Sequence, residues 1–180
     1  MTVPTLVTSY GGSADNCYAD LTDATSFISN TIIDDSPWTV ATTEARAKAL
    51  ILATYDIDAY NYGGNRLYYD QVLQFPRTVQ GEEPFPWGSA LSDTSTWNTY
   101  QTEMLRSVKQ ACCYQALFIL KYSGKKTIHQ EFASQGIASV SRSAGGISES
   151  YGYRTGINRL CSEASALMAA YRIGPRLVRG

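Results

Sequence analysis

The sequence lacks the residue clusters that build most metal sites and nucleophilic sites. It has a single histidine, His129, and its four cysteines show no Cys-x-x-Cys spacing and no histidine partner at zinc distances. It also contains no Gly-x-Ser-x-Gly elbow, phosphate-binding loop, dinucleotide-binding glycine pattern or EF-hand loop. Asp56 and Asp58 are two apart on a predicted helix, so their carboxylates do not face each other. We therefore expect no enzymatic activity, no catalytic residue, no metal and no cofactor.

Long apolar runs are also missing. No stretch reaches the about 20 apolar residues of a membrane-spanning helix, and the chain does not open with a basic segment followed by an apolar one. We expect a soluble protein made in the cytoplasm. The cysteines (Cys17, Cys112, Cys113 and Cys161) are then expected to be reduced and mostly buried.

Charge is scarce and unevenly distributed. Charged residues make up 17% of the chain, and the net charge is −1. Residues 1–45 hold six acids and no base, a net charge of −6, whereas residues 46–180 hold ten acids and fifteen bases, a net charge of +5. These two oppositely charged parts of the chain can pair within one subunit, or between identical neighbouring subunits. The overall charge argues against sequence-specific DNA binding, although local Lys or Arg can contact a DNA backbone.

Apolar residues at helical spacing predict four helices, at about 22–30, 42–60, 102–123 and 156–171. Pro37 is expected to end any continuation of the first helix. Gly63-Gly64 is expected to end the second helix, and Gly124 the third.

Two segments between the helices are expected to make contacts. Residues 61–102 are irregular and rich in Pro and Gly, and they include Trp87 and Trp97. Aromatic residues in a polar loop are typical of a contact surface, although both could instead fold back over the core. Residues 136–151 predict a polar β-hairpin that turns at Ser143-Ala144-Gly145-Gly146. Such a hairpin is marginal alone, so a neighbouring subunit is a candidate partner.

Together these patterns predict a mainly α fold class, with a four-helix core, one β-hairpin and extended N- and C-terminal arms. The length of 180 residues suits one domain over residues 1–180. Residues 1–17 form the expected N-terminal arm. Residues 172–180 carry three arginines, no acid and several apolar residues that no later element covers, which favours a docking tail.

The long third helix and the residues after it form a basic stretch. Between Glu103 and Glu131 there are five bases and no acid: Arg106, Lys109, Lys121, Lys125 and Lys126. These residues form either a solvated face or a surface that faces DNA or an acidic neighbour.

Several motifs occur in the order found in a known family. The segment 15–24, leading into Phe27, resembles the Asn-x-Tyr-x-x-Leu-x-x-Ala opening of phage head–tail connector proteins. These are also called adaptor or head-completion proteins, and some are labelled DnaT-like. The similarity continues through residues 49–54, Phe75-Pro76-Arg77 and the long helix around residues 108–120.

The resemblance implies a structural virion protein of a bacteriophage. It would form a homo-oligomeric ring, commonly a dodecamer, in the neck between portal and tail, with a lumen for DNA passage during genome retention and ejection. The implied partners are the portal protein, identical subunits, a downstream neck or tail protein and, non-specifically, double-stranded DNA, but no membrane. The implied location is the head–tail interface of the virion, after assembly in the host bacterial cytoplasm.

The resemblance also assigns roles to particular residues. Portal binding falls to Arg172, Ile173, Pro175, Arg176, Leu177, Val178 and Arg179. Candidates for subunit or tail contacts are Trp87, Trp97, Arg142, Ile147 and Tyr151, and candidates for facing DNA are Lys121, Lys125 and Lys126. The alternative is a single-stranded DNA-binding, DnaT-like replication factor, which should show stacking aromatic residues beside a basic groove and salt-dependent affinity.

Overall fold

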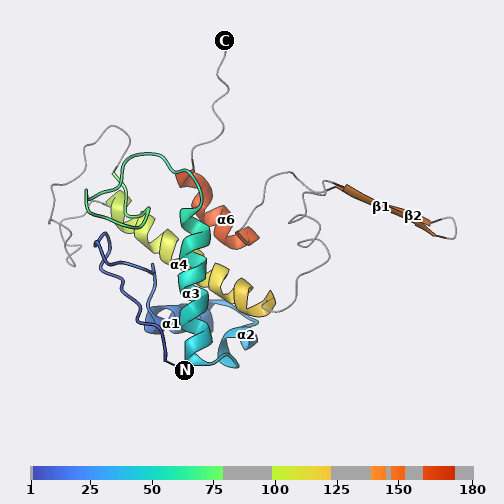
Figure 1. The fold of residues 1–180 in the computed structure, drawn as a ribbon, viewed down its shortest axis with the longest axis horizontal. Coiled ribbons are helices and arrows are strands. Elements are labelled where there is room, and N and C mark those ends of the chain that lie inside the picture. Colours follow the sequence, from blue (N-terminus) through green and yellow to red (C-terminus); the bar gives the residue numbers. More distant parts are fainter. Residues whose placement is uncertain (1, 79–98, 123–138, 145–146, 153–159, 173–180) are drawn as a thin grey trace, which may run out of the picture. The chain divides into compact units, whose positions relative to one another are not determined.

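The computed structural model describes residues 2–78, 99–122, 139–144, 147–152 and 160–172 (Figure 1). The chain divides into two compact units, one formed by residues 1–121 and 160–180 and the other by residues 122–159. The helices lie in the first unit, apart from the last residue of α4, and the two strands lie in the second. Within the described ranges, no helix is both long enough and apolar enough to cross a membrane.

The first two helices, α1 (Leu21–Thr31) and α2 (Ser36–Thr39), are joined by a short turn. The Asp20 side chain caps α1 by accepting a hydrogen bond from the backbone N–H of Asp23, at 2.8 Å. Pro37 is the second residue of α2 and does not end a helix, because proline fits the first helical turn, where its missing N–H has no partner to lose. Trp38 of α2 is fully buried, and its Nε1–H donates to Oγ1 of Thr25 on α1.

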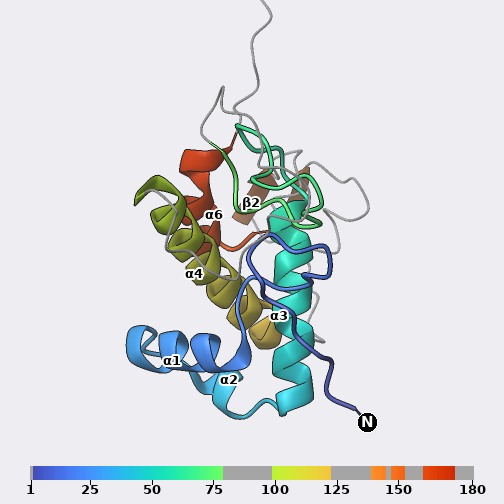
Figure 2. The ribbon, with the colours of Figure 1, turned by 90° about the vertical axis from the view of Figure 1, so that its left-hand side faces the viewer.

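The two long helices are α3 (Thr43–Asp58) and α4 (Thr99–Tyr122), which lie side by side in Figures 1 and 2. Thr42 caps α3 by accepting from the N–H of Ala45. Where the two helices meet, Oγ1 of Thr54 lies 3.7 Å from Sγ of Cys112. The chain's four cysteines are free and buried, as the sequence predicts.

The C-terminal helix α6 (Ser162–Met168) runs into a 3-10 turn, η1 (Ala169–Tyr171). It begins about six residues later than the sequence pattern predicts. Cys161 is extended, and its N–H donates to Oε1 of Gln115 on α4 at 2.8 Å. This contact fixes the chain beside α4 before the helix starts.

The predicted N-terminal arm is wrong, because residues 5–18 fold back onto the helices as a hydrogen-bonded loop. The Asp15 carboxylate is 5% exposed and accepts hydrogen bonds from the backbone N–H groups of Ser9, Gly11 and Gly12. Gly11 has a φ of +113°, a conformation that side chains rarely adopt. A Cβ there would lie 2.5 Å from the ring of Tyr68.

The first part of the predicted irregular segment, residues 61–78, is a loop held by one arginine. Arg77 is 8% exposed, and its guanidinium donates to the backbone carbonyls of Tyr62, Gly63, Gly64 and Gln74. The loop is therefore a fixed part of the first unit. The remainder of that predicted loop up to residue 98 lies outside the described residues.

The core of the first unit joins this loop to the helices. Phe75 is 1% exposed, and its ring lies edge-on to the rings of Tyr18, Tyr62 and Tyr171, with centroids 6.1, 4.6 and 5.9 Å away. Tyr18 comes from the N-terminal loop, Tyr62 from the loop of residues 61–78, and Tyr171 from η1. The core is thus built from segments far apart in sequence.

The second unit contains strands β1 (Ser139–Ala144) and β2 (Ile147–Gly152), paired antiparallel. Their register places Arg142 opposite Glu149, Val140 opposite Tyr151, and Ala144 opposite Ile147.

The predicted fold class, a four-helix core with a β-hairpin and extended arms, is wrong. The described residues contain five α-helices, and the described part of the first unit contains no β-strand. The four residues of α2 are too short to show a helical period. The strands belong to the other unit, so they are not part of the helical core.

Candidate functional site

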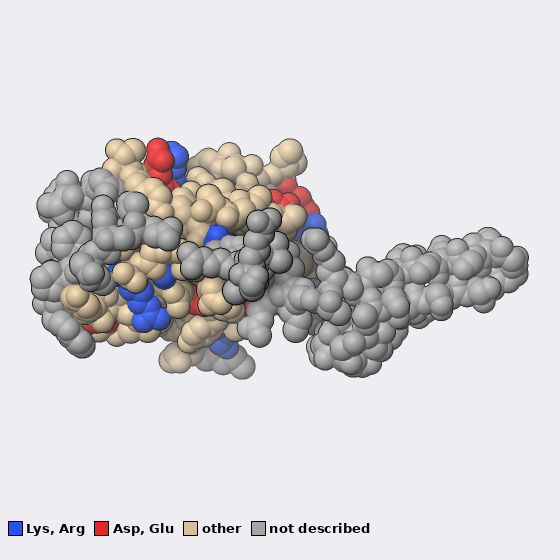
Figure 3. All heavy atoms as spheres, turned by 90° about the horizontal axis from the view of Figure 1, so that it is seen from above, with Lys and Arg blue, Asp and Glu red and all other residues tan. Residues whose placement is uncertain are grey.

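Most basic side chains in the described ranges are already engaged within the protein. Those with a hydrogen bond or ion pair to another described group are Arg46, Lys48, Arg66, Arg77, Lys109, Lys121 and Arg172. The side chain of Arg106, exposed on α4, forms no hydrogen bond or ion pair within the described part of the chain. Figure 3 shows that, on the face seen from above, the described Lys and Arg atoms form separate spots, some of them next to Asp or Glu atoms.

Arg106 lies at a groove of about 410 Å³ between α1 and the first half of α4. Three residues on one side of α1 line it: Asp23, Ser26 and Phe27. The lining residues of α4 each lie three or four positions from another: Thr102, Leu105, Arg106, Lys109, Gln110 and Cys113. Because α-helical residues at this spacing share a face, the periodic pattern of α4 itself places these side chains together.

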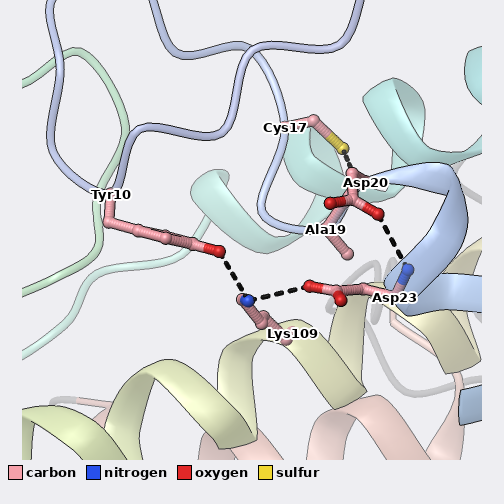
Figure 4. Close-up of polar contacts among 6 residues, drawn as sticks. All are labelled: Tyr10, Cys17, Ala19, Asp20, Asp23 and Lys109. Carbon is pink, nitrogen blue, oxygen red and sulfur yellow. Dashed lines mark hydrogen bonds and ion pairs between the residues drawn. The ribbon is translucent and has the colours of Figure 1, made fainter. Parts of the chain in front are cut away.

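Lys109 holds the N-terminal loop and α1 together at this groove (Figure 4). Its Nζ lies 2.7 Å from the hydroxyl oxygen of Tyr10 and 2.9 Å from Oδ2 of Asp23, and 4.5 Å from the centre of the Tyr10 ring. Burial alone would lower the pKa of Lys109, but the hydrogen bonds with Tyr10 and Asp23 outweigh burial, so the pKa is raised. Lys109 therefore remains charged at neutral pH.

The groove carries a net positive charge. Asp23 supplies one negative charge, while Arg106 and Lys109 each supply a positive one. Gln110 is half-buried and its side chain has no hydrogen bond within the described ranges, so the side-chain amide is available to a ligand.

The remaining wall of the groove is apolar. Phe27 is half-buried. The centroid of its ring lies 5.4 Å from that of Tyr114, and the two rings are nearly perpendicular. Ala19 and Leu105 are buried beside it. Burial raises the pKa of the Cys113 thiol to about 12, so this wall residue stays neutral. The groove can therefore accept a ligand that combines an anionic group with a flat apolar one.

Of the predicted DNA-facing residues, the structure describes only Lys121, which does not line this groove. Lys121 lies in the last turn of α4, twelve residues beyond Lys109 and so roughly 18 Å along the helix, where it pairs with Asp34 at 3.5 Å. Lys125 and Lys126 lie outside the described residues. The basic stretch of the sequence included Arg106 and Lys109, but nothing in it pointed to Phe27, Tyr10 or Gln110.

Of the residues predicted to bind portal, only Arg172 is described, and it packs on the helical unit. Its guanidinium carbon lies 4.0 Å from the centre of the Tyr60 ring, and its Nη1 is 3.3 Å from Oγ of Ser165. The others, Ile173, Pro175, Arg176, Leu177, Val178 and Arg179, lie outside the described residues, as do Trp87 and Trp97. For Arg142, Ile147 and Tyr151 only the backbone pairing is described.

The described ranges contain no group of three or more His, Cys, Asp or Glu residues that could hold a metal ion. The acidic residues of α3 have protein partners. Asp56 accepts from Nε2 of Gln115, and Asp58 accepts from the hydroxyl of Tyr18.

Comparison with known proteins overturns the connector prediction. A family model described as "Putative DnaT-like ssDNA binding protein" matches residues 5–172. No curated protein and no solved structure matches the chain. Nothing in these comparisons supports a head–tail connector family, so the predicted virion ring between portal and tail is wrong.

The residues on which that prediction rested explain the error. Tyr18 is buried against Asp58, and Arg77 holds its own loop, so these motif residues build the fold and carry no information about a docking partner. The family match favours the alternative function instead. The chain belongs to the DnaT-like ssDNA-binding protein family.

Proposed function

We propose that the protein binds single-stranded DNA and catalyses no reaction on it. The observation that carries the proposal is the family match, which extends over residues 5–172. The groove between α1 and α4 supports it, because single-stranded DNA offers phosphates to cations and unstacked bases to aromatic and apolar side chains.

The charge distribution supports the same function. Residues 122–159 contain five bases and two acids, a net charge of +3 in a chain whose total is −1. Basic residues of this unit attract a polyanion at long range, and each phosphate contact releases a counterion. The affinity should therefore fall steeply as the salt concentration rises.

Single-stranded DNA is favoured over duplex DNA because of the apolar wall of the groove. In a duplex the bases are stacked and paired, so Phe27 and Leu105 would have no base to contact. Arg106 could still meet a duplex phosphate, which predicts weaker but measurable duplex binding.

A competition experiment tests this function. A fluorescein-labelled oligothymidylate of roughly 30 nucleotides, longer than the site of a single ssDNA-binding fold, is titrated with the full chain at about 50 mM salt. Fluorescence anisotropy then reports its displacement by unlabelled single strand or by duplex of the same length. The single strand should compete at a lower concentration. Equal competition by the duplex, or no binding of the labelled strand, would contradict the proposal.

A further inference from the structure

We propose that the groove between α1 and α4 is a subsite for one nucleotide of the bound single strand, with the phosphate at Arg106 and Lys109 and the base against Phe27. This inference rests on the proposed function. It names a specific place on the protein where the strand is held.

The phosphate end of the subsite follows from the two cations of α4. Arg106 and Lys109 are three residues apart, so both side chains lie on the face of α4 that lines the groove. The Arg106 guanidinium, which has no partner in the described ranges, offers a fork of N–H donors that matches a phosphate. The Lys109 ammonium has three N–H groups and uses two of them on Tyr10 and Asp23, which leaves one for a ligand.

The base end of the subsite follows from the apolar wall. Phe27 presents an aromatic ring, and Leu105 and Cys113 continue the apolar surface on α4. The volume of about 410 Å³ lies within the range of pockets that hold small organic ligands. Gln110 can both donate and accept a hydrogen bond, so it can meet the edge of any base without selecting one strongly.

Asp23 makes this a subsite for a nucleotide and not for a bare anion. Its carboxylate pairs with Lys109 at 2.9 Å and leaves the groove with a net charge of only +1. A free anion is therefore held weakly, and the contact with the base must supply the rest of the affinity. We expect an oligonucleotide of abasic sites, which keeps its phosphates, to bind about fivefold or more weakly than oligothymidylate.

The first test removes the unpaired cation. Arg106→Gln should weaken binding of oligothymidylate about tenfold, which is about 1.4 kcal/mol. It should also reduce the slope of log K against log salt by about 0.7, the value for one phosphate contact on a single strand. Lys48→Gln is the matched control, because it removes the same charge from an exposed position on α3 outside the groove. It should change affinity less than twofold.

The second test adds a negatively charged side chain to the groove and leaves Arg106 and Lys109 unchanged. Ser26→Glu places a carboxylate at an exposed position that lines the groove, whereas Ser29→Glu places it at an exposed position of α1 outside it. The first variant should bind oligothymidylate about tenfold more weakly than the second, with both unfolding at the wild-type temperature. The new carboxylate repels the phosphates of both strands, but it displaces a base only from oligothymidylate, so the Ser26→Glu loss should be smaller for the abasic strand.

The outcomes separate the two proposals. If wild type binds single strands and Ser26→Glu equals Ser29→Glu, the subsite is wrong and the proposed function stands. An equal Ser26→Glu loss for abasic and thymidylate strands refutes the placement of the base. If wild type binds no single strand, both proposals fall together.

Discussion

The buried carboxylate of Asp58 gives a quantitative prediction about stability and pH. Asp58 ends α3 and accepts a hydrogen bond from the hydroxyl of Tyr18, while the N–H of Gln74 donates to its Oδ2 at 3.2 Å. Burial disfavours the ionised form and outweighs these hydrogen bonds, so the pKa of Asp58 is raised from 3.8 to about 6. The folded protein therefore binds this proton more tightly than the unfolded chain does.

The size of the effect follows from these two pKa values. Raising a pKa from 3.8 to about 6 corresponds to about 3 kcal/mol, at 1.36 kcal/mol per pH unit. Because the folded-state value is the higher one, protonated Asp58 favours the fold at low pH, and this contribution is lost as the pH rises through about 4 to 6. About 2.4 kcal/mol of the change falls between pH 4 and pH 7.

Urea unfolding of wild type and Asp58→Asn at pH 4 and pH 7 measures this effect. The amide does not titrate, so its difference from the protonated carboxyl is the same at both pH values and cancels when the two differences are compared. The free energy of unfolding of Asp58→Asn relative to wild type should rise by about 2.4 kcal/mol from pH 4 to pH 7. Glu103→Gln, an exposed carboxylate changed to its amide, is the control. A difference for Asp58→Asn that does not change with pH would refute the reasoning.

Three further substitutions, one of them with a control, test local structure by the urea concentration at half-unfolding. Arg77→Lys loses the guanidinium fork that holds its loop and should cost about 3 kcal/mol or more; an unchanged midpoint would show that the loop holds itself. Asp20→Ala removes the cap of α1 and should cost about 1 kcal/mol, whereas Asp35→Ala, at a cap position without a side-chain hydrogen bond, should cost less. Gly11→Ala should cost more than about 1 kcal/mol, because its φ is positive and its Cβ would meet Tyr68; a neutral result would contradict this conformation.

The long helices could be predicted from sequence because each carries a repeating apolar face. The pattern from Ala47 to Ile57 identifies the buried side of α3, and all but one of its positions are buried in the structure. The pattern was less informative at helix ends. α4 begins at Thr99, a few residues before the predicted start near Thr102, and α6 begins at Ser162 because Gln115 holds the preceding backbone.

The N-terminal loop could not be predicted because its stability comes from one side chain and several backbone groups. Gly11-Gly12 suggests a break in an arm, yet the N–H groups of both glycines point at the Asp15 carboxylate. Sequence periodicity carries no signal for such a loop, since neither an apolar stripe nor a paired strand is involved.

The sequence indicated only some of the residues that line the groove. Arg106 and Lys109 belong to the basic stretch that suggested a DNA-facing surface, but the residues predicted to face DNA were Lys121, Lys125 and Lys126. The partner of Lys109 is Asp23, 86 positions earlier in the chain. No local pattern indicates a contact over that separation, so the aromatic and acidic side of the groove emerged only from the fold.

The central claim is that this chain binds single-stranded DNA through phosphate and base contacts. The most direct measurement is the affinity of the full-length wild-type protein for oligothymidylate as a function of salt. The account predicts binding at about 50 mM salt and a straight decline of log K against log salt, with a slope of about −0.7 for each phosphate contacted. No binding at that salt concentration, or an affinity that does not depend on salt, would contradict it.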